Sequence, residues 1–75
     1  MLFKELETVV LTEDIPTQDL RRGDIGAIVH TYQNPEGYEV EFVTLGGETI
    51  AVMTLLPSQI RHADKRELPH VRAVA

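Results

Sequence analysis

The chain has 75 residues, which is enough for one small domain, and it contains no cysteine. The lack of cysteine excludes disulfides and thiolate chemistry and fits a reducing compartment. No apolar run approaches the roughly 20 residues that a membrane-spanning helix needs, and the N-terminal stretch MLFKELETVV carries glutamates where a signal peptide carries lysines. We therefore expect a cytoplasmic protein that makes no membrane contact.

The net charge of −5 is unevenly distributed along the chain. Residues 1–60 contain ten acidic and three basic residues, whereas residues 61–75 contain four basic and two acidic residues. An acidic body repels phosphate backbones. The composition therefore disfavours nucleic-acid binding by the main part of the chain.

The first half of the chain predicts two strands separated by a long loop. Residues 8–12, TVVLT, are β-branched and apolar, which favours a strand, and the preceding LFKELE fits either a helical turn or a fraying end. In the next segment, EDIPTQDLRRGD, proline and glycine favour an irregular loop that is anchored inward by Ile15 and Leu20. Residues 26–32, GAIVHTY, then predict the second strand.

The third predicted strand, GYEVEFV, alternates between two kinds of side chain. Tyr38, Val40 and Phe42 are large and apolar, and Glu39 and Glu41 stand between them. Successive side chains of a strand point to opposite faces of the sheet. We therefore expect the three apolar residues to face a core and the two glutamates to face water, as in an antiparallel sheet.

Turn signals bound this strand on both sides. The segment NPEG before it contains Gly37, which permits positive φ, and Gly46-Gly47 marks the turn after it. Residues 48–55, ETIAVMTL, predict the fourth strand. This segment is more uniformly apolar than the third strand, so we expect a strand that is central or covered on both faces.

The last part of the chain predicts a short turn and then a tail. Pro57 and Ser58 open a turn that is too brief for a stable helix, and Ile60 is placed to close one end of the core. Residues 63–75 show no period and contain Pro69, so we expect a flexible tail after a domain at residues 1–62. Hairpin-linked short strands favour an all-β small barrel, whose closure protects its edges.

The order of these elements resembles an SH3-like barrel, with a long first loop, a meander, one 3₁₀ turn and a brief last strand. LLPSQIR occupies the place of the 3₁₀ turn, and RRGDIGAIV is similar to a KOW-type entry into the second strand. The combination of TVVLTEDIP, LRRGDIGAIV, GYEVEF and TLLPSQIR resembles a short bacterial family of domains of unknown function over residues 3–62. The resemblance implies a small SH3-like barrel of four to five antiparallel strands and transfers no catalytic residue.

The residue types that carry chemistry do not form a recognisable set. His30, His62 and His70 lack the short spacing typical of metal ligands, so we expect no metal site. Glu39 and Glu41 face water in the predicted strand, which does not suit an acid–base pair. The chain has no nucleophile elbow and no glycine-rich phosphate loop. We therefore expect neither catalytic residues nor a cofactor, and no enzyme activity.

The predicted loop between the first two strands is the main candidate for binding, because long loops on small barrels often carry it. Its charges suit either of two roles: they solvate the loop and pair among themselves, or they form a partner surface. A tyrosine near the first hairpin is added because tyrosine is common at interface hot spots. The candidate partner-binding residues are Glu13, Asp14, Asp19, Arg21, Arg22, Asp24 and Tyr32.

These observations favour a non-catalytic protein-interaction module, an accessory or regulatory partner of another protein whose gene could lie nearby. A homodimer is a further option, because a small core gains from shared burial. The alternative is a KOW-like nucleic-acid-binding barrel, which requires the tail to fold near the loop and form a basic edge. That edge would consist of Arg21, Arg22, Arg61, Lys65, Arg66 and Arg72. A third option, an enzyme or a metal site between subunits, has no positive support.

Overall fold

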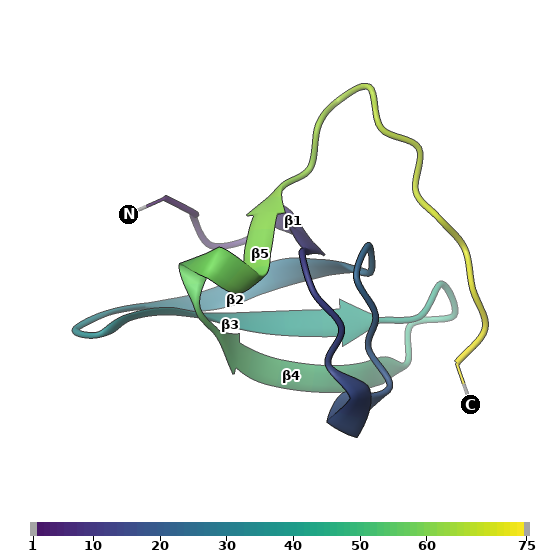
Figure 1. Ribbon diagram of the computed structural model, residues 1–75, viewed down its shortest axis with the longest axis horizontal. Helices are drawn as coiled ribbons and strands as arrows, with labels where there is room; N and C mark the ends of the chain where they lie inside the picture. Colours follow the sequence, from purple (N-terminus) through teal and green to yellow (C-terminus); the bar gives the residue numbers. More distant parts are fainter. Residues whose placement is uncertain (1, 75) are drawn as a thin grey trace.

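The computed structural model describes residues 2–74, which form one antiparallel sheet in the order β4-β3-β2-β1-β5 (Figure 1). The strands are β1 (Thr8–Leu11), β2 (Ile25–Gln33), β3 (Glu36–Val43), β4 (Thr49–Leu55) and β5 (Ile60–His62). The all-β prediction and the predicted strand order along the chain are confirmed. The predicted 3₁₀ turn is η2 (Pro57–Gln59), and a second one, η1 (Pro16–Gln18), lies inside the long first loop. Within residues 2–74 no helix is long and apolar enough to cross a membrane.

The alternation in β3 sorts its side chains as the sequence predicts. Tyr38, Val40 and Phe42 are buried in the core, and Glu39 and Glu41 lie on the other face. The two glutamates are half-buried, because threonine hydroxyls of β4 donate hydrogen bonds to them, at 2.6 Å from Thr54 to Glu39 and 2.8 Å from Thr49 to Glu41. The outer face of the meander is therefore a polar ladder across two strands.

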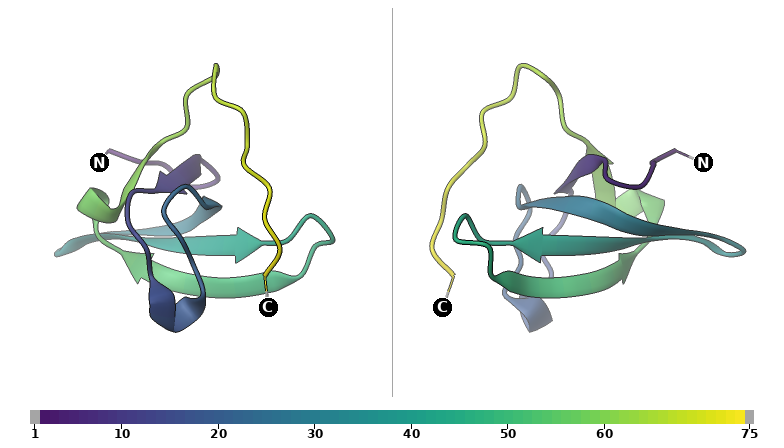
Figure 2. Two further views of the ribbon diagram at one scale, coloured as in Figure 1. Left: turned by 45° about the vertical axis from the view of Figure 1, so that its right-hand side comes forward. Right: turned by 180° about the vertical axis from the view of Figure 1, so that it is seen from behind.

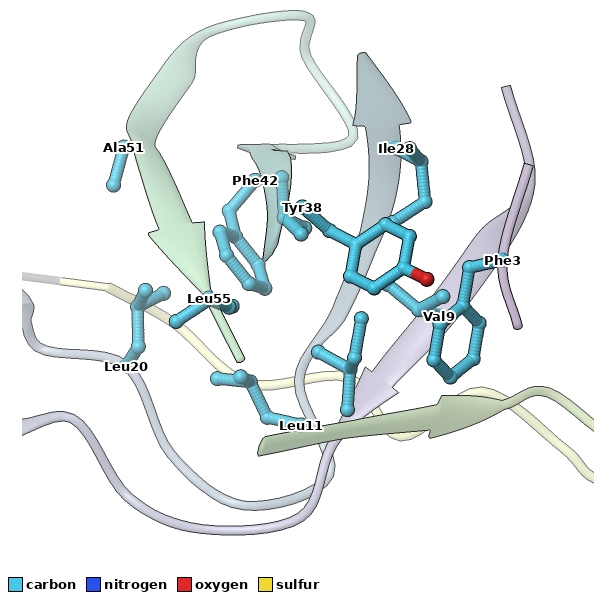
Figure 3. Packing of buried hydrophobic residues seen from close by; sticks show 11 residues of the cluster. Phe3, Val9, Leu11, Leu20, Ile28, Tyr38, Phe42, Ala51 and Leu55 are labelled. Atoms are coloured by element: carbon cyan, nitrogen blue, oxygen red, sulfur yellow. The ribbon is translucent and has the colours of Figure 1, made fainter. Parts of the chain in front are cut away.

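The core is completed by an N-terminal residue that the sequence pattern did not single out. Residues 2–7 form neither a helix nor a strand, yet Phe3 is buried, and its ring meets the Tyr38 ring edge-on at 5.1 Å (Figure 3). The segment is fixed by a 2.7 Å hydrogen bond from the Leu6 N–H to the Ile28 carbonyl. The LFKELE stretch is thus an ordered cap on the core rather than a helical turn or a fraying end.

The position predicted for β4 is wrong. This strand is at the edge of the sheet, where it pairs only with β3, and Val52 on its outer face is 52% exposed. Ala51 and Leu55 point into the core, and Ile50 and Met53 pack partly against it. The high apolar content therefore reflects full or partial contacts of β4 with the one core and not a second covering layer.

Two glycines serve close packing or strand pairing instead of turns. Gly37 lies within β3, so its predicted turn role is wrong; the turn between β2 and β3 consists of Asn34 and Pro35 alone. Gly26 lies within β2, and a Cβ added there would stand 2.6 Å from Val40 and 2.9 Å from Phe42. The lack of a side chain at Gly26 therefore lets β2 approach the core face of β3.

The chain after β4 closes one end of the core and then returns along the molecule. Ile60, at the start of β5, is buried as predicted. Residues 63–74 form no regular element and run back beside the β3–β4 turn (Figure 2). This stretch is called the C-terminal segment below.

Candidate functional site

The β1–β2 loop, residues 12–24, is folded in part by its own acidic side chains. The Asp14 carboxylate accepts a 2.8 Å hydrogen bond from the Arg22 N–H, and the Asp24 carboxylate accepts one of the same length from the Arg21 N–H. Two of the predicted binding carboxylates therefore hold the loop backbone. Neither carboxylate pairs with a charged side chain of the loop, so the pairing of loop charges among themselves that the sequence left open is not seen for Asp14 and Asp24.

Apolar anchors and a glycine turn fix the loop against the body. Leu20 is buried, and its backbone pairs with that of Ile15 through hydrogen bonds of 2.8 and 3.1 Å. The Gly23 N–H donates to the Leu11 carbonyl at 2.9 Å, and Gly23 adopts a φ of +95° that few other residues tolerate. The loop is thus a rigid platform, anchored inward as the sequence predicts.

The side chains of Arg21 and Arg22 remain exposed on this platform. Among the residues that the structure describes, neither guanidinium forms an ion pair. Their backbone N–H groups are occupied by Asp24 and Asp14, so the loop positions both cations without using their charges. They are two exposed cations on an otherwise acidic body.

Asp24 connects the loop to the C-terminal segment. Arg72 donates to its carboxylate from Nε at 2.9 Å and from Nη2 at 2.5 Å, and it donates to the Asp19 carbonyl at 2.7 Å. Both side chains of the pair are only 17% exposed. The hydrogen bond from Arg72 lowers the pKa of Asp24 against the opposing effect of burial, and the same bond raises the pKa of Arg72. Asp24 is therefore ionised, and its carboxylate is already bound by the guanidinium of Arg72.

Two hollows border the loop. The larger has a volume of about 440 Å³ and lies between the loop, the β3–β4 turn and the C-terminal segment; we call it the groove. Its walls are mainly apolar, and Leu45 on one of them is 96% exposed. The smaller hollow, of about 250 Å³, is lined by Asp14, Pro16, Asp19, Leu20 and Arg21. Because Leu20 lines both hollows, the loop forms the ridge between them.

Two of the predicted binding residues lie away from this ridge. Glu13 is near η2, where its carboxylate is 3.4 Å from the side-chain amide of Gln59. Tyr32 pairs with Gly37 in the β2–β3 hairpin, which extends away from the loop, and its ring lies edge-on to His30 (Figures 1 and 2). The structure therefore separates Glu13 and Tyr32 from the other candidates, which are Asp14, Asp19, Arg21, Arg22 and Asp24.

The three histidines occupy different places. His30 is 3.9 Å from Glu5, His62 contacts the carboxylate of Glu7, and His70 lines the groove. The pKa of Glu7 is lowered, mainly because its carboxylate accepts a hydrogen bond from the Lys4 N–H and further because of His62. Within residues 2–74 no three histidine or carboxylate side chains gather as a metal-binding group.

Sequence reasoning placed binding at the loop and a groove beside it, but it did not predict the contact between Asp24 and Arg72. The contact joins residues 48 positions apart, both in segments without periodicity. The only signal was the opposite charge of the two segments, since the body is acidic and the last residues are basic.

Comparison with known proteins assigns the family. No curated protein and no solved structure matches the chain. Residues 5–62 match the family described as "Domain of unknown function (DUF4926)". The match spans all five strands and the β1–β2 loop and ends before the C-terminal segment. Since it covers more than half of the chain, the resemblance to a family of domains of unknown function is confirmed, and the chain belongs to the DUF4926 family.

Proposed function

We propose that this protein is a non-catalytic protein-interaction module, a small accessory or regulatory partner of another protein. It binds through the β1–β2 loop and the groove beside it. The observation that carries this proposal is the ridge itself: on a hydrogen-bonded loop between two hollows, Arg21 and Arg22 are exposed, and neither forms an ion pair with any residue from 2 to 74. Apolar residues beside oriented charges are typical of docking surfaces.

The strand order supports an SH3-like barrel as the framework of this module. β1 and β5 run across the β2–β3–β4 meander, and η2 stands between β4 and β5, where the resemblance places it (Figure 1). Such a barrel is filled by its own side chains and presents its loops, so binding belongs to the loops. A bacterial origin and a cytoplasmic location belong to the same proposal and rest on the family resemblance and on the lack of cysteine.

The chemistry of the ridge indicates what the partner offers. A guanidinium pairs with carboxylates through two parallel hydrogen bonds, so Arg21 and Arg22 fit an acidic patch. Residues 1–60 are strongly acidic otherwise, which repels a partner that is acidic over a wide area. The partner therefore carries a small acidic patch within a neutral or basic surface.

Affinity purification from the native cell tests the proposal, with the wild-type chain and two charge-reversed variants as baits. We expect one protein in stoichiometric amount with the wild type, and its loss with Arg21→Glu/Arg22→Glu. The matched control, Lys65→Glu/Arg66→Glu, changes the net charge equally but lies in the C-terminal segment and should retain the partner. Recovery of no stoichiometric protein by the wild type, or equal loss in both variants, counts against binding at the ridge.

The nucleic-acid alternative requires the tail to fold near the loop, and Arg72 of the C-terminal segment does lie beside it. Two of its six basic residues are nevertheless neutralised: Arg72 pairs with Asp24, and Arg61 pairs with Glu67 through bonds of 2.8 and 2.7 Å. These contacts favour the protein-interaction proposal. A titration with RNA and duplex DNA at low salt separates the two, and we expect no complex at micromolar protein. A complex whose affinity falls steeply with salt would favour the alternative.

A further inference from the structure

Residues 69–74 are attached to the body by one charged side chain and by apolar contacts. Among the residues that the structure describes, Arg72 provides all the side-chain hydrogen bonds between this stretch and the body. In the described part of the chain, the only backbone hydrogen bond of the C-terminal segment is internal, from the Glu67 N–H to the Asp64 carbonyl. The stretch is therefore bound like an extended peptide ligand and is not part of the sheet.

The groove is larger than its present occupant. Phe42 and Leu20 contribute buried walls, while Val43 and Leu45 stay exposed although the segment lies over the groove. The neighbours of Arg72 in the segment, Val71 and Ala73, are both exposed and so fill little of the groove. A volume of about 440 Å³ remains between the segment and the body, within the range of about 300–1,000 Å³ typical of ligand sites. A bulkier apolar side chain beside the arginine would bury more of these walls.

The groove and its occupant belong to different parts of the chain. The family match at residues 5–62 includes Asp24, Phe42 and Val43, and it ends before residues 69–74. The body of the domain thus supplies a carboxylate with apolar walls, and the segment beyond it supplies the arginine. The acidic charge of residues 1–60 favours a cationic segment in this position.

We propose that the groove is a docking site for an extended segment of the partner protein that carries an arginine next to a bulky apolar residue. In the free protein, residues 69–74 occupy the site and compete with that segment. This inference rests on the proposed function, since the partner supplies the competing segment. The guanidinium of the partner replaces Arg72 on Asp24, and carboxylates of the partner reach the neighbouring Arg21 and Arg22.

An attached competitor weakens binding of a free peptide in a defined way. A short flexible connection holds the attached segment at an effective concentration of about millimolar at the site. A peptide in solution binds well only when the attached segment is released. Replacement of Arg72 should therefore increase peptide affinity, whereas a merely structural Arg72 contact would leave the affinity low.

The experiment uses the full ¹⁵N-labelled chain and three synthetic peptides that copy residues 69–74: the natural sequence, one with Ala73→Phe and one with Arg72→Ala. Binding to the wild type and to the Arg72→Ala variant is followed by NMR. We expect the Ala73→Phe peptide to shift signals of Ile25 and of residues 43–46 in the variant and to bind the wild type at least about tenfold more weakly. The natural peptide should bind the variant more weakly than the Ala73→Phe peptide does, and the Arg72→Ala peptide should not bind.

Two further substitutions, each combined with Arg72→Ala, locate the site. Asp24→Asn should abolish binding of the Ala73→Phe peptide, because the amide no longer offers a charge to the arginine. Asp14→Asn is the matched control: Asp14 also accepts a backbone hydrogen bond in the loop but does not line the groove, so binding should persist. Equal peptide affinity for wild type and variant, no binding to the variant, or equal loss with both substitutions would overturn the inference.

A second copy of the chain is the competing occupant. If segments were exchanged between two copies, the wild type would be a dimer by light scattering and Arg72→Ala a monomer, and the inference would be wrong. The proposed function is tested separately by the purification with Arg21→Glu/Arg22→Glu. If the purification recovers a partner but the peptides do not bind, the docking inference alone is wrong. If the peptides bind but the purification recovers no partner, the proposed function is wrong.

Discussion

The five-stranded body and the C-terminal segment are held by different forces. The body encloses a cluster of eleven buried hydrophobic residues, and none of its described polar residues is buried (Figure 3). Residues 69–74 are held mainly by the ion pair between Arg72 and Asp24. Buried apolar side chains neither titrate nor lose their contacts through electrostatic screening, whereas a partly exposed ion pair responds to pH and is screened by salt. The segment can therefore leave the groove while the body stays folded.

The magnitudes support this separation. Burial of one large apolar side chain contributes about 1.5–3 kcal/mol, and the core has several such side chains. An exposed ion pair contributes about 0.2–1 kcal/mol, and the partial burial of the Arg72–Asp24 pair raises that figure only modestly.

Truncation of one leucine in each region should give the largest difference in the free energy of unfolding. Leu11 is 1% exposed in the core, and Leu68 is 92% exposed in the C-terminal segment. Leu11→Ala should lower the free energy of unfolding by about 2.5–5 kcal/mol, because it removes buried methyl groups and leaves a cavity. Leu68→Ala should change it by less than about 0.5 kcal/mol. Urea unfolding followed by circular dichroism measures both, and similar values would show that the segment belongs to the folded core.

Gly26→Ala should have the next largest effect, by overpacking the body. Its Cβ would stand 2.6 Å from Val40 and 2.9 Å from Phe42, so side chains in the core must shift. We expect a loss of about 1–3 kcal/mol in the free energy of unfolding. Gly46→Ala is the matched control, since the atom nearest to its added Cβ is 3.8 Å away. If the two variants were equally stable, the close approach of β2 to β3 would be relaxed in solution.

Arg72→Ala should release the segment and leave the body almost unchanged. We expect a stability change smaller than those of Leu11→Ala and Gly26→Ala, because one ion pair is lost while the buried core is unchanged. Residues 69–74 should become mobile, with lower heteronuclear NOE values and faster cleavage by a protease. Arg66→Ala is the control within the same segment, because no ion pair of Arg66 is present in residues 2–74. A segment that stays rigid in Arg72→Ala would contradict the role of this contact as its anchor.

The same contrast explains how much could be predicted from the sequence. In the body, the alternation of Tyr38, Val40 and Phe42 with two glutamates predicted the inner face of β3, and Pro57 with Ser58 predicted η2. These features depend on neighbours in the chain, whose relative positions backbone geometry determines. The edge position of β4 depends instead on which strands pair, and composition does not specify that.

Long-range contacts account for the rest of what sequence reasoning missed. Phe3 is one apolar residue in a stretch without a period, and only its packing against Tyr38 identifies it as core. The candidate residues of the loop were predicted by charge and position, but their roles were not. Asp24 serves as an anchor because Arg72, 48 residues later in the chain, folds back onto it. No local sequence pattern indicates such a contact.

The smallest predicted effect is a change in the titration of Asp24. Its pKa is lowered in the folded chain, mainly by the hydrogen bond from Arg72. A lowered pKa means that the contact stabilises the folded chain at pH values above about 4 and that this contribution is lost as the pH falls through the lowered pKa. In Arg72→Ala the pKa of Asp24 should rise, because the largest of the effects that lower it is lost. Carboxyl ¹³C NMR titration measures this shift, with Arg66→Ala as the control that should leave it unchanged. If the pKa of Asp24 were the same in the wild type and in Arg72→Ala, the guanidinium would not occupy the carboxylate in solution, and the groove would be open in the free protein.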